Sequence, residues 1–322
     1  MGRSTTTGAN ERKAGMTAPE HQISIPTRLQ ETVTSWDGRS GKVWLEALPQ
    51  LVRNYLDHWQ LTLERVFEPG GQVSLVVYVR RDDGSPAVLK LGLPSPESAQ
   101  EHAALAHWDG RGAVRLLAAA PADHAMLLER LNGEVPLRSL AESKAMLEAA
   151  GTLQRLWVAP PEAHPFTTVA DHVAALCESL RRRRDLVAVA ELRPLLDEAL
   201  DLAEQLLADD TEQLLLHGDF HHGNVLSAER SPWLAIDPKP LVGERAYDLA
   251  WLAQDRLETL SGVPGPEAAA RRRLQRLSEA VEVDRDRLRG WTLFRTVEAG
   301  LWSLEVGDSR NATLFLEFAA ML

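Results

Sequence analysis

The sequence lacks several features that would place it in a particular class of protein. Its 322 residues contain a single cysteine, Cys177, so no internal disulfide can form and nothing indicates an oxidising compartment. No apolar run approaches the roughly 18 to 20 residues of a membrane span, and the N-terminus has no apolar signal-peptide core. We therefore expect a cytoplasmic protein without a membrane partner, with one large or two modest domains.

Positive charge is also scarce. The chain has 35 Lys and Arg against 46 Asp and Glu, a net charge of −11. This balance disfavours nucleic acid as the main partner. The arginine run at positions 181–184 is expected to be a solvated helix end, because no aromatic residues are interleaved with it. An acidic chain is compatible with a cationic small-molecule substrate, and no obligate protein partner is evident.

The segment 214–239, LLLHGDFHHGNVLSAERSPWLAIDPK, is the most informative part of the chain. An apolar run predicts a strand, a loop rich in Gly and His follows, and two short strands joined by a polar turn end the segment. Asp219 and Asn224 are five residues apart on the loop, and Asp237 follows the hairpin. This spacing is typical of kinases, in which one Asp orients the attacking hydroxyl while an Asn and a second Asp hold Mg²⁺ on the nucleotide phosphates.

Two alternatives remain open for this loop. His217 and His221 are four residues apart, as zinc ligands on one helix face would be, but Gly218 and Gly223 argue against a helix and no cysteine lies near. The loop is otherwise an ordinary polar connection with hydrogen-bonded histidines. The rest of the chain has to decide between these readings.

The N-terminal part predicts a five-stranded antiparallel sheet that follows two helices. The helices are expected at residues 25–36 and 43–59, and the strands at 61–67, 73–79, 87–91, 114–118 and 125–128.

The loop between the first two strands is a candidate cover for nucleotide phosphates. Gly70 and Gly71 allow backbone N–H groups to approach phosphate oxygens, and Ser74 follows them at the start of the second strand. The loop is not a G-x-G-x-x-G sequence, so an ordinary hairpin turn is the alternative. This glycine-containing loop indicates a nucleotide site only in combination with the other kinase-like residues of the chain.

Lys90 lies between apolar residues in the third strand and requires an anionic partner if it is buried. Glu101, in a helix expected at 96–108, is the candidate that orients Lys90 toward the phosphates, and Glu97 is the fallback. A solvated lysine at a strand edge and glutamates on a solvated helix face are the alternatives.

The domain organisation follows from these elements. Residues 1–24 are polar and expected to be disordered, 25–130 to form the nucleotide-binding lobe, and 131–322 a second, mainly helical lobe. The connector begins at Glu129, and adenine is expected to bind beside the backbone of Glu129 to Leu131.

With these residues in this order, the chain resembles the aminoglycoside phosphotransferases. The resemblance rests on His217-Gly218-Asp219 with Asn224, then on Asp237, and then on Asp248 in the next helix. The stretches LLHGDFHHGNVL at 215–226 and WLAIDPKP at 233–240 are similar to the streptomycin 6-phosphotransferase branch, also described as the aminoglycoside/hydroxyurea kinase branch. The resemblance implies an α+β, two-lobed protein-kinase-like fold that uses ATP and Mg²⁺.

The remaining predictions concern the loop and the acceptor. His221 is expected to touch the γ-phosphate or the acceptor, Lys239 to contact phosphate or substrate, and Asp248 to cap the helix or brace the loop. A guanidinium or amine on the acceptor requires carboxylates on the C-terminal helices. The candidates are Asp255, Glu258, Glu298, Glu305 and Asp308.

Three functions compete. The first is a kinase that phosphorylates the 6-hydroxyl of streptomycin and confers resistance. The second is a kinase of the same fold that acts on hydroxyurea, another aminoglycoside, a cationic peptide antibiotic or a metabolite. The third is a nucleotide-binding pseudokinase, which the intact Lys90, Asp219, Asn224 and Asp237 disfavour. A protein substrate is not expected, because only about ten residues separate Asp237 from Asp248, too few for a long activation loop.

Overall fold

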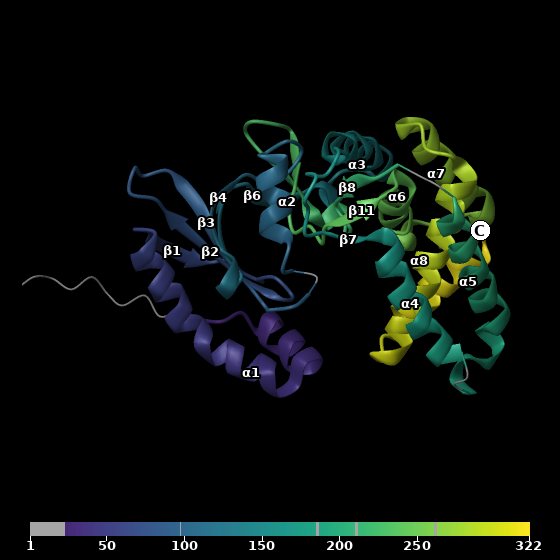
Figure 1. Cartoon of the computed structure of the whole chain (residues 1–322), viewed down its shortest axis with the longest axis horizontal. Helices are drawn as coiled ribbons and strands as arrows, with labels where there is room; N and C mark the ends of the chain where they lie inside the picture. Colours follow the sequence, from purple (N-terminus) through teal and green to yellow (C-terminus); the bar gives the residue numbers. More distant parts are fainter. Residues whose placement is uncertain (1–22, 97, 185–186, 210–211, 261–262) are drawn as a thin grey trace, which may run out of the picture.

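The computed structural model describes residues 23–96, 98–184, 187–209, 212–260 and 263–322. It has two lobes, a smaller one built on an antiparallel sheet and a larger one that is mainly helical (Figure 1). The predicted α+β, two-lobed fold is therefore confirmed. The tail expected at residues 1–24 lies outside the described residues, apart from its last two positions.

The sheet of the N-terminal lobe has the predicted five antiparallel strands, in the order β1-β2-β3-β5-β4. β2 and β3 pair along their whole length, with Val76 opposite Lys90. Because successive side chains of a strand point to opposite faces, Leu89 and Leu91 lie on one face of the sheet and Lys90 on the other. The strands are β1 (Thr62–Val66), β2 (Ser74–Arg80), β3 (Pro86–Gly92), β4 (Leu116–Ala120) and β5 (Ala125–Glu129).

A long bent helix, α1 (Thr27–His58), covers one face of this sheet (Figure 1). Leu29 and Val33 before the bend and Leu48 after it are completely buried against the sheet, and each contributes roughly 1.5 to 3 kcal/mol. Two helices are predicted here, and the structure joins them at Gly38, with φ 51° and ψ −115°. Only glycine adopts this conformation at low cost, so the bend has a local cause.

The helix that carries Glu101 is shorter than the predicted 96–108. α2 covers Glu101–Trp108, and turns precede it, in which the Ser98 hydroxyl donates to the Leu93 carbonyl over 3.1 Å. Prolines before Ser98 lack an N–H and fix the backbone outside a helix, which delays the start. Glu97, the fallback partner of Lys90, lies outside the described residues.

The C-terminal lobe is held together by one large core. Trp291 and Phe294 of α8 are completely buried, as is Tyr247 of α6, and the Tyr247 and Trp291 rings meet edge to face at 5.1 Å. Cys177 is buried in α4, as predicted. The described helices of this lobe are α3 (Glu142–Leu156), α4 (Val169–Arg184), α5 (Arg193–Ala208), α6 (Arg245–Ala253), α7 (Pro266–Val281), α8 (Arg285–Glu305) and α9 (Ser309–Ala320).

Short strands in this lobe hold the loop of segment 214–239. The predicted strand and hairpin are present. The prediction missed three strands: β6, which pairs with β9, the two-residue β7, and β11, which lies between β7 and β8. These strands are β6 (Asn132–Pro136), β7 (Thr167–Thr168), β8 (Leu214–Leu216), β9 (Val225–Ser227), β10 (Trp233–Ala235) and β11 (Leu241–Gly243). None of the described helices is long and apolar enough to cross a membrane.

Candidate active site

The loop after β8 and the open end of the β9–β10 hairpin bring three predicted residues together. The Asn224 side-chain nitrogen donates to the Asp219 carbonyl oxygen over 3.0 Å. The antiparallel register of the hairpin continues as a hydrogen bond from the Ile236 N–H to the Asn224 carbonyl, at 2.9 Å. Asp237 follows immediately and therefore lies beside Asn224. Residues that the sequence separates by a hairpin share one site in the fold.

Asp248 braces the loop, as predicted. Its carboxylate accepts the N–H groups of His217 at 3.0 Å and Gly218 at 2.9 Å, and it also accepts the Trp157 indole N–H at 3.0 Å. The Asp248 side chain is completely buried, so these charge-assisted bonds replace its hydration. The residue preceding α6 is Glu244, so the brace, not a helix cap, is what Asp248 provides.

The loop also lies directly against the chain that follows Asp237. The Lys239 N–H donates to the His217 carbonyl over 2.8 Å. Gly218 has φ +74°, and a Cβ built on it would lie 1.9 Å from the Lys239 carbonyl oxygen. This approach places the Lys239 ammonium 2.8 Å from Oδ2 of Asp219. Lys239 therefore contacts the predicted catalytic carboxylate.

The predicted ion pair between Lys90 and Glu101 is present. The Lys90 ammonium lies 2.6 Å and 2.7 Å from the two Glu101 oxygens, and both side chains are buried. Lys90 also donates to Oδ1 of Asp237 in the other lobe. The lysine on β3 thus connects α2 to the site in the C-terminal lobe.

Because the Lys90 ammonium lies between the Glu101 and Asp237 carboxylates, the pKa values of all three groups are shifted. Burial opposes the Lys90 charge, but Asp237 and Glu101 outweigh it and raise the Lys90 pKa. Burial raises the pKa of Glu101 to about 7, because Lys90 offsets only part of the desolvation and Asp237 adds repulsion. Partial desolvation opposes the Asp237 charge, but Lys90 prevails and lowers the Asp237 pKa. Lys90 thus favours the charged form of Asp237 more strongly than that of Glu101.

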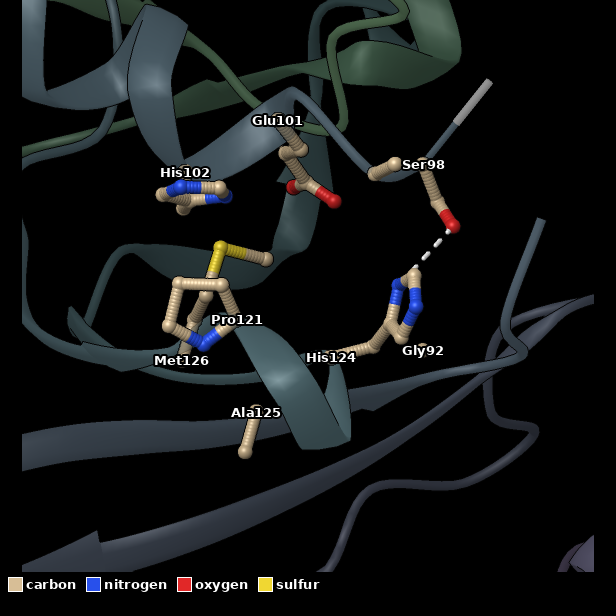
Figure 2. A pocket seen from close by; sticks show the side chains of 9 residues that line it. Gly92, Ser98, Glu101, His102, Pro121, His124, Ala125 and Met126 are labelled. Carbon is tan, nitrogen blue, oxygen red and sulfur yellow. Dashed lines mark hydrogen bonds between the residues drawn. The ribbon is translucent and has the colours of Figure 1, made fainter. Parts of the chain in front are cut away.

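Glu101 also borders a small pocket between α2 and the start of β5 (Figure 2). Ser98 and His124 close it from one side, with the Ser98 hydroxyl 3.4 Å from Nδ1 of His124. Its volume of about 10 Å³ has room for no more than one water molecule. The pocket is therefore not a second ligand site.

Asn224 and Asp237 fit the demands of a magnesium ion. The Asn224 nitrogen is held by the Asp219 carbonyl, which leaves Oδ1 as its ligand atom, and Lys90 occupies only Oδ1 of Asp237. The Asp237 side chain is 41% exposed and therefore accessible. Mg²⁺ takes few protein oxygens besides phosphate and water. Among the described residues, no group of three or more His, Cys, Asp or Glu side chains is arranged to hold a metal ion.

The two neighbouring histidines have different surroundings. His221 accepts the Gly223 N–H through Nδ1 at 3.1 Å, which leaves Nε2 on the other edge of the ring for a ligand. The His222 N–H donates to Oδ2 of Asp255 over 2.8 Å, and its Nδ1 lies 2.5 Å from the same oxygen. His222 thus fixes the loop, and the contact of His221 with a phosphate or the acceptor stays a prediction.

Asp255, one of the predicted acceptor carboxylates, supports the loop. One oxygen binds His222, and the other accepts the Arg256 N–H at 2.8 Å. Burial opposes the Asp255 charge, but the bonds from His222 lower its pKa far below the usual range. Both oxygens therefore accept hydrogen bonds from the protein, and the contact of Asp255 with an acceptor stays a prediction.

His217 is buried as a neutral ring. Its Nδ1 accepts the Asp219 N–H at 3.3 Å, so Nε2 carries the proton and donates to the Ile236 carbonyl at 3.0 Å. Burial lowers the His217 pKa below its usual 6.5, because a second proton would have to face an N–H group without water. The unfolded chain accepts that proton first. The free energy of unfolding is therefore expected to fall as the pH drops below about 6.5.

This pH effect is best measured by comparison with His217→Gln, which keeps a donor and an acceptor but does not titrate. The raised pKa of Glu101 acts in the opposite direction in the same range, since its contribution is lost as the pH rises through about 7. We expect the stability difference between parent and variant, from urea unfolding, to shrink between about pH 7.5 and 5.5, by at most about 1.4 kcal/mol per pH unit. A constant difference would contradict a buried neutral ring.

The predicted phosphate loop is compact. Gly70 has φ +82°, and a Cβ on it would lie 2.8 Å from the Pro26 ring at the start of α1. A Cβ on Gly71 would lie 2.7 Å from the Ser74 hydroxyl oxygen, and Ser74 itself is buried. The glycines therefore let the loop fold back over Ser74 at the beginning of β2.

The connector is fixed by an arginine that the sequence did not single out. Glu129 accepts the Arg115 N–H at 2.7 Å, and its carboxylate pairs with Arg230 from the β9–β10 turn at 2.5 Å. Arg230 also donates to the Gly110 carbonyl at 2.6 Å. The Glu129 side chain is thus engaged between the lobes. Leu131, its neighbour in the predicted adenine site, packs against the core of the C-terminal lobe.

The predicted acceptor carboxylates are not equivalent. Glu258 pairs with Arg138 at 2.8 Å, Glu305 pairs with Arg183 at 2.5 Å, and Asp308 caps α9, so each of these has a local partner. Glu298 on α8 influences the titration of Tyr247, a residue of the buried core. Glu298 also interacts electrostatically with Arg295 on the same helix, and Asp255 is the member of the set that contacts the catalytic loop directly.

Arg295 on α8 is a buried arginine that the sequence analysis did not single out. It is buried, donates to the Tyr247 hydroxyl at 3.0 Å, and its guanidinium lies 4.2 Å from the Trp251 ring centre. Its Nε has no hydrogen-bond partner among the described residues. Burial opposes its charge, but Tyr247, Glu298 and Asp219 raise its pKa. The available signal was an arginine inside the apolar stretch 291–297.

The chain is similar to characterised kinases over most of its length. The family described as aminoglycoside/hydroxyurea antibiotic resistance kinase matches residues 58–307. A streptomycin 6-kinase of Streptomyces glaucescens is 38% identical over 289 residues, which cover 89% of this chain and 93% of that protein. A hydroxyurea phosphotransferase of Kitasatospora aureofaciens is 39% identical over 293 residues, covering 89% and 82%.

The fold also has counterparts among solved structures. A thermostable mutant of an aminoglycoside phosphotransferase, in a ternary complex with ADP and hygromycin B, matches with a TM-score of 0.58 over 84% of this chain and 96% of that chain. At 16% identity, this likeness shows the fold alone. Together with the family match over more than half of its length, these findings establish that the chain belongs to the aminoglycoside/hydroxyurea antibiotic resistance kinase family.

Proposed function

We propose that this protein transfers the γ-phosphoryl group of ATP, with Mg²⁺, to the 6-hydroxyl of streptomycin and thereby confers resistance. The observation that carries the proposal is the meeting of Asp219, Asn224 and Asp237 opposite Lys90, in a chain 38% identical to a streptomycin 6-kinase. A cytoplasmic location, where ATP is available, is part of the proposal.

The nucleotide is proposed to bind between residues 25–130 and 131–322. Adenine lies beside the backbone from Glu129 to Leu131, and the loop with Gly70, Gly71 and Ser74 covers the phosphates. Lys90 contacts the α- and β-phosphates and is oriented by Glu101, which explains why that pair is buried together. Both the adenine and the phosphates must be held for the γ-phosphate to be positioned for transfer.

Phosphoryl transfer is then mainly a matter of position and charge. Asn224 and Asp237 would hold Mg²⁺, which neutralises phosphate charge when bound. Asp219 accepts a hydrogen bond from the acceptor hydroxyl and aligns it with the γ-phosphorus. Lys239, 2.8 Å from Asp219, is placed to hold both that carboxylate and a phosphate oxygen. The transition state is loose, so alignment contributes more than proton removal.

Hydroxyurea is the second candidate acceptor, because a hydroxyurea phosphotransferase is as similar to this chain as the streptomycin kinase is. The two acceptors make different demands. Streptomycin carries guanidinium groups that suit a carboxylate such as Glu298, whereas hydroxyurea is small and uncharged. The acidic chain favours the cationic acceptor.

A coupled ADP-release assay with Mg·ATP tests the proposal. The acceptors are streptomycin, other aminoglycosides, hydroxyurea and cationic peptide antibiotics, each with product mass determined. We expect turnover on streptomycin and a product heavier by one phosphoryl group. Turnover on hydroxyurea alone would replace the proposal by the second candidate. Stabilisation by Mg·ATP without turnover on any acceptor would indicate a pseudokinase instead.

A further inference from the structure

Two tryptophans on opposite lobes meet at the open side of the molecule. Trp36 lies on α1 just before the bend at Gly38, and Trp302 lies near the end of α8. Their ring centroids are 5.8 Å apart, and the rings meet edge to face at 83°. Trp36 is nevertheless 48% exposed and Trp302 40% exposed. Aromatic surface of this size, left open at the junction of two lobes, is available to a ligand.

Each tryptophan is carried firmly by its own lobe. Val33, nearly one turn before Trp36, is completely buried in the core beneath the sheet. Leu301, next to Trp302, is buried in the core of the C-terminal lobe. In Figure 1 the bend of α1 faces the lower end of α8. The pair therefore spans the two lobes, on rigid elements.

One face of α8 leads from the catalytic loop to this pair. Arg295, Glu298 and Trp302 are spaced by three and four residues, so they lie on the same side of the helix. Arg295 interacts electrostatically with both Asp219 and Glu298. At 1.5 Å per residue, the distance from Arg295 to Trp302 is about 10 Å. That span accommodates an acceptor of several linked rings whose reactive hydroxyl lies at Asp219.

We propose that Trp36 and Trp302 form the outer wall of the acceptor site, where a guanidinium or ammonium group of the acceptor lies between the indole rings and Glu298. Cations bind over tryptophan faces, and a carboxylate one turn away adds charge complementarity. The proposal rests on the proposed function and extends it: one wall residue comes from each lobe, so acceptor binding and lobe closure are coupled.

The test measures kcat and both KM values, with streptomycin and Mg·ATP, for Trp36→Ala and Trp302→Ala. Each change is expected to raise the KM for streptomycin about tenfold. The KM for Mg·ATP should stay within about twofold, because the nucleotide binds elsewhere. Trp36→Phe and Trp302→Phe keep a ring and should recover part of the loss, which a merely structural role would not require.

The control variants are Val43→Ala on α1 and Leu304→Ala on α8, which remove comparably exposed apolar side chains away from the contact. Both should leave the streptomycin KM unchanged. If the parent turns over streptomycin while both tryptophan variants keep its KM within twofold, the wall is refuted and the proposed function stands. A parent that phosphorylates no acceptor overturns the proposed function, and the wall with it.

Discussion

Asp219→Asn is expected to lower kcat by roughly three orders of magnitude while Mg·ATP still binds. The structure explains why binding survives. The loop is held through the Asp219 backbone, whose carbonyl accepts from Asn224, and through Asp248 beneath His217. The Asp219 carboxylate itself pairs with the Lys239 ammonium, so the backbone bonds that shape the loop do not depend on its charge. An asparagine of the same shape therefore removes the negative charge and replaces one acceptor oxygen by an NH2 donor, so the substrate hydroxyl loses its proton acceptor without the site being dismantled.

The measurement is kcat with the accepted substrate, together with the thermal shift that Mg·ATP produces in each protein. Asp237→Ala is the matched comparison, because it removes a carboxylate from the proposed metal position and from Lys90. That variant should lose most of the Mg²⁺-dependent thermal shift, whereas Asp219→Asn should keep it. Turnover by Asp219→Asn within a few-fold of the parent would show that Asp219 is not the residue that orients the hydroxyl.

The sequence was informative where chemistry is concentrated in a short segment. The loop and hairpin of segment 214–239 bring Asp219, Asn224 and Asp237 together through local pairing, so spacing alone predicted their meeting. Lys90 and Glu101 were also predictable, because a lysine within an apolar strand requires a partner and the next helix begins with a glutamate. In these cases the interactions are close in sequence or follow a fixed periodicity.

The predictions failed where a residue's role depends on partners far along the chain. β6 has the composition of a turn, and only its pairing with β9 makes it a strand. The contact between His222 and Asp255, 33 residues apart, was not foreseen either. Trp36 and Trp302 are separated by most of the chain and meet only because α1 bends at Gly38. No local pattern contains that information.

Gly218→Ala is expected to be the most disruptive single methyl group that can be added to the catalytic loop. Gly218 has φ +74°, a conformation that costs an alanine about 1 to 2 kcal/mol. Its Cβ would also lie 1.9 Å from the Lys239 carbonyl oxygen, far inside contact distance. Neither the loop nor the Lys239 segment can move away easily, because Asp248 accepts the loop N–H groups and the Lys239 N–H donates to the His217 carbonyl. We expect the free energy of unfolding to fall by more than about 3 kcal/mol.

Gly307→Ala separates the two contributions. Gly307 has φ +79°, and a Cβ on it would meet nothing within 4 Å, so this variant experiences the backbone strain without the collision. It should lose only about 1 kcal/mol and keep full activity. Gly218→Ala should also lose kcat, because the displaced segments carry Asp219 and Lys239, whose 2.8 Å contact depends on the close approach. Equal losses in the two variants, measured by urea unfolding, would mean that the loop and the Lys239 segment move apart freely. The tight backbone contact would then not be what positions the catalytic carboxylate.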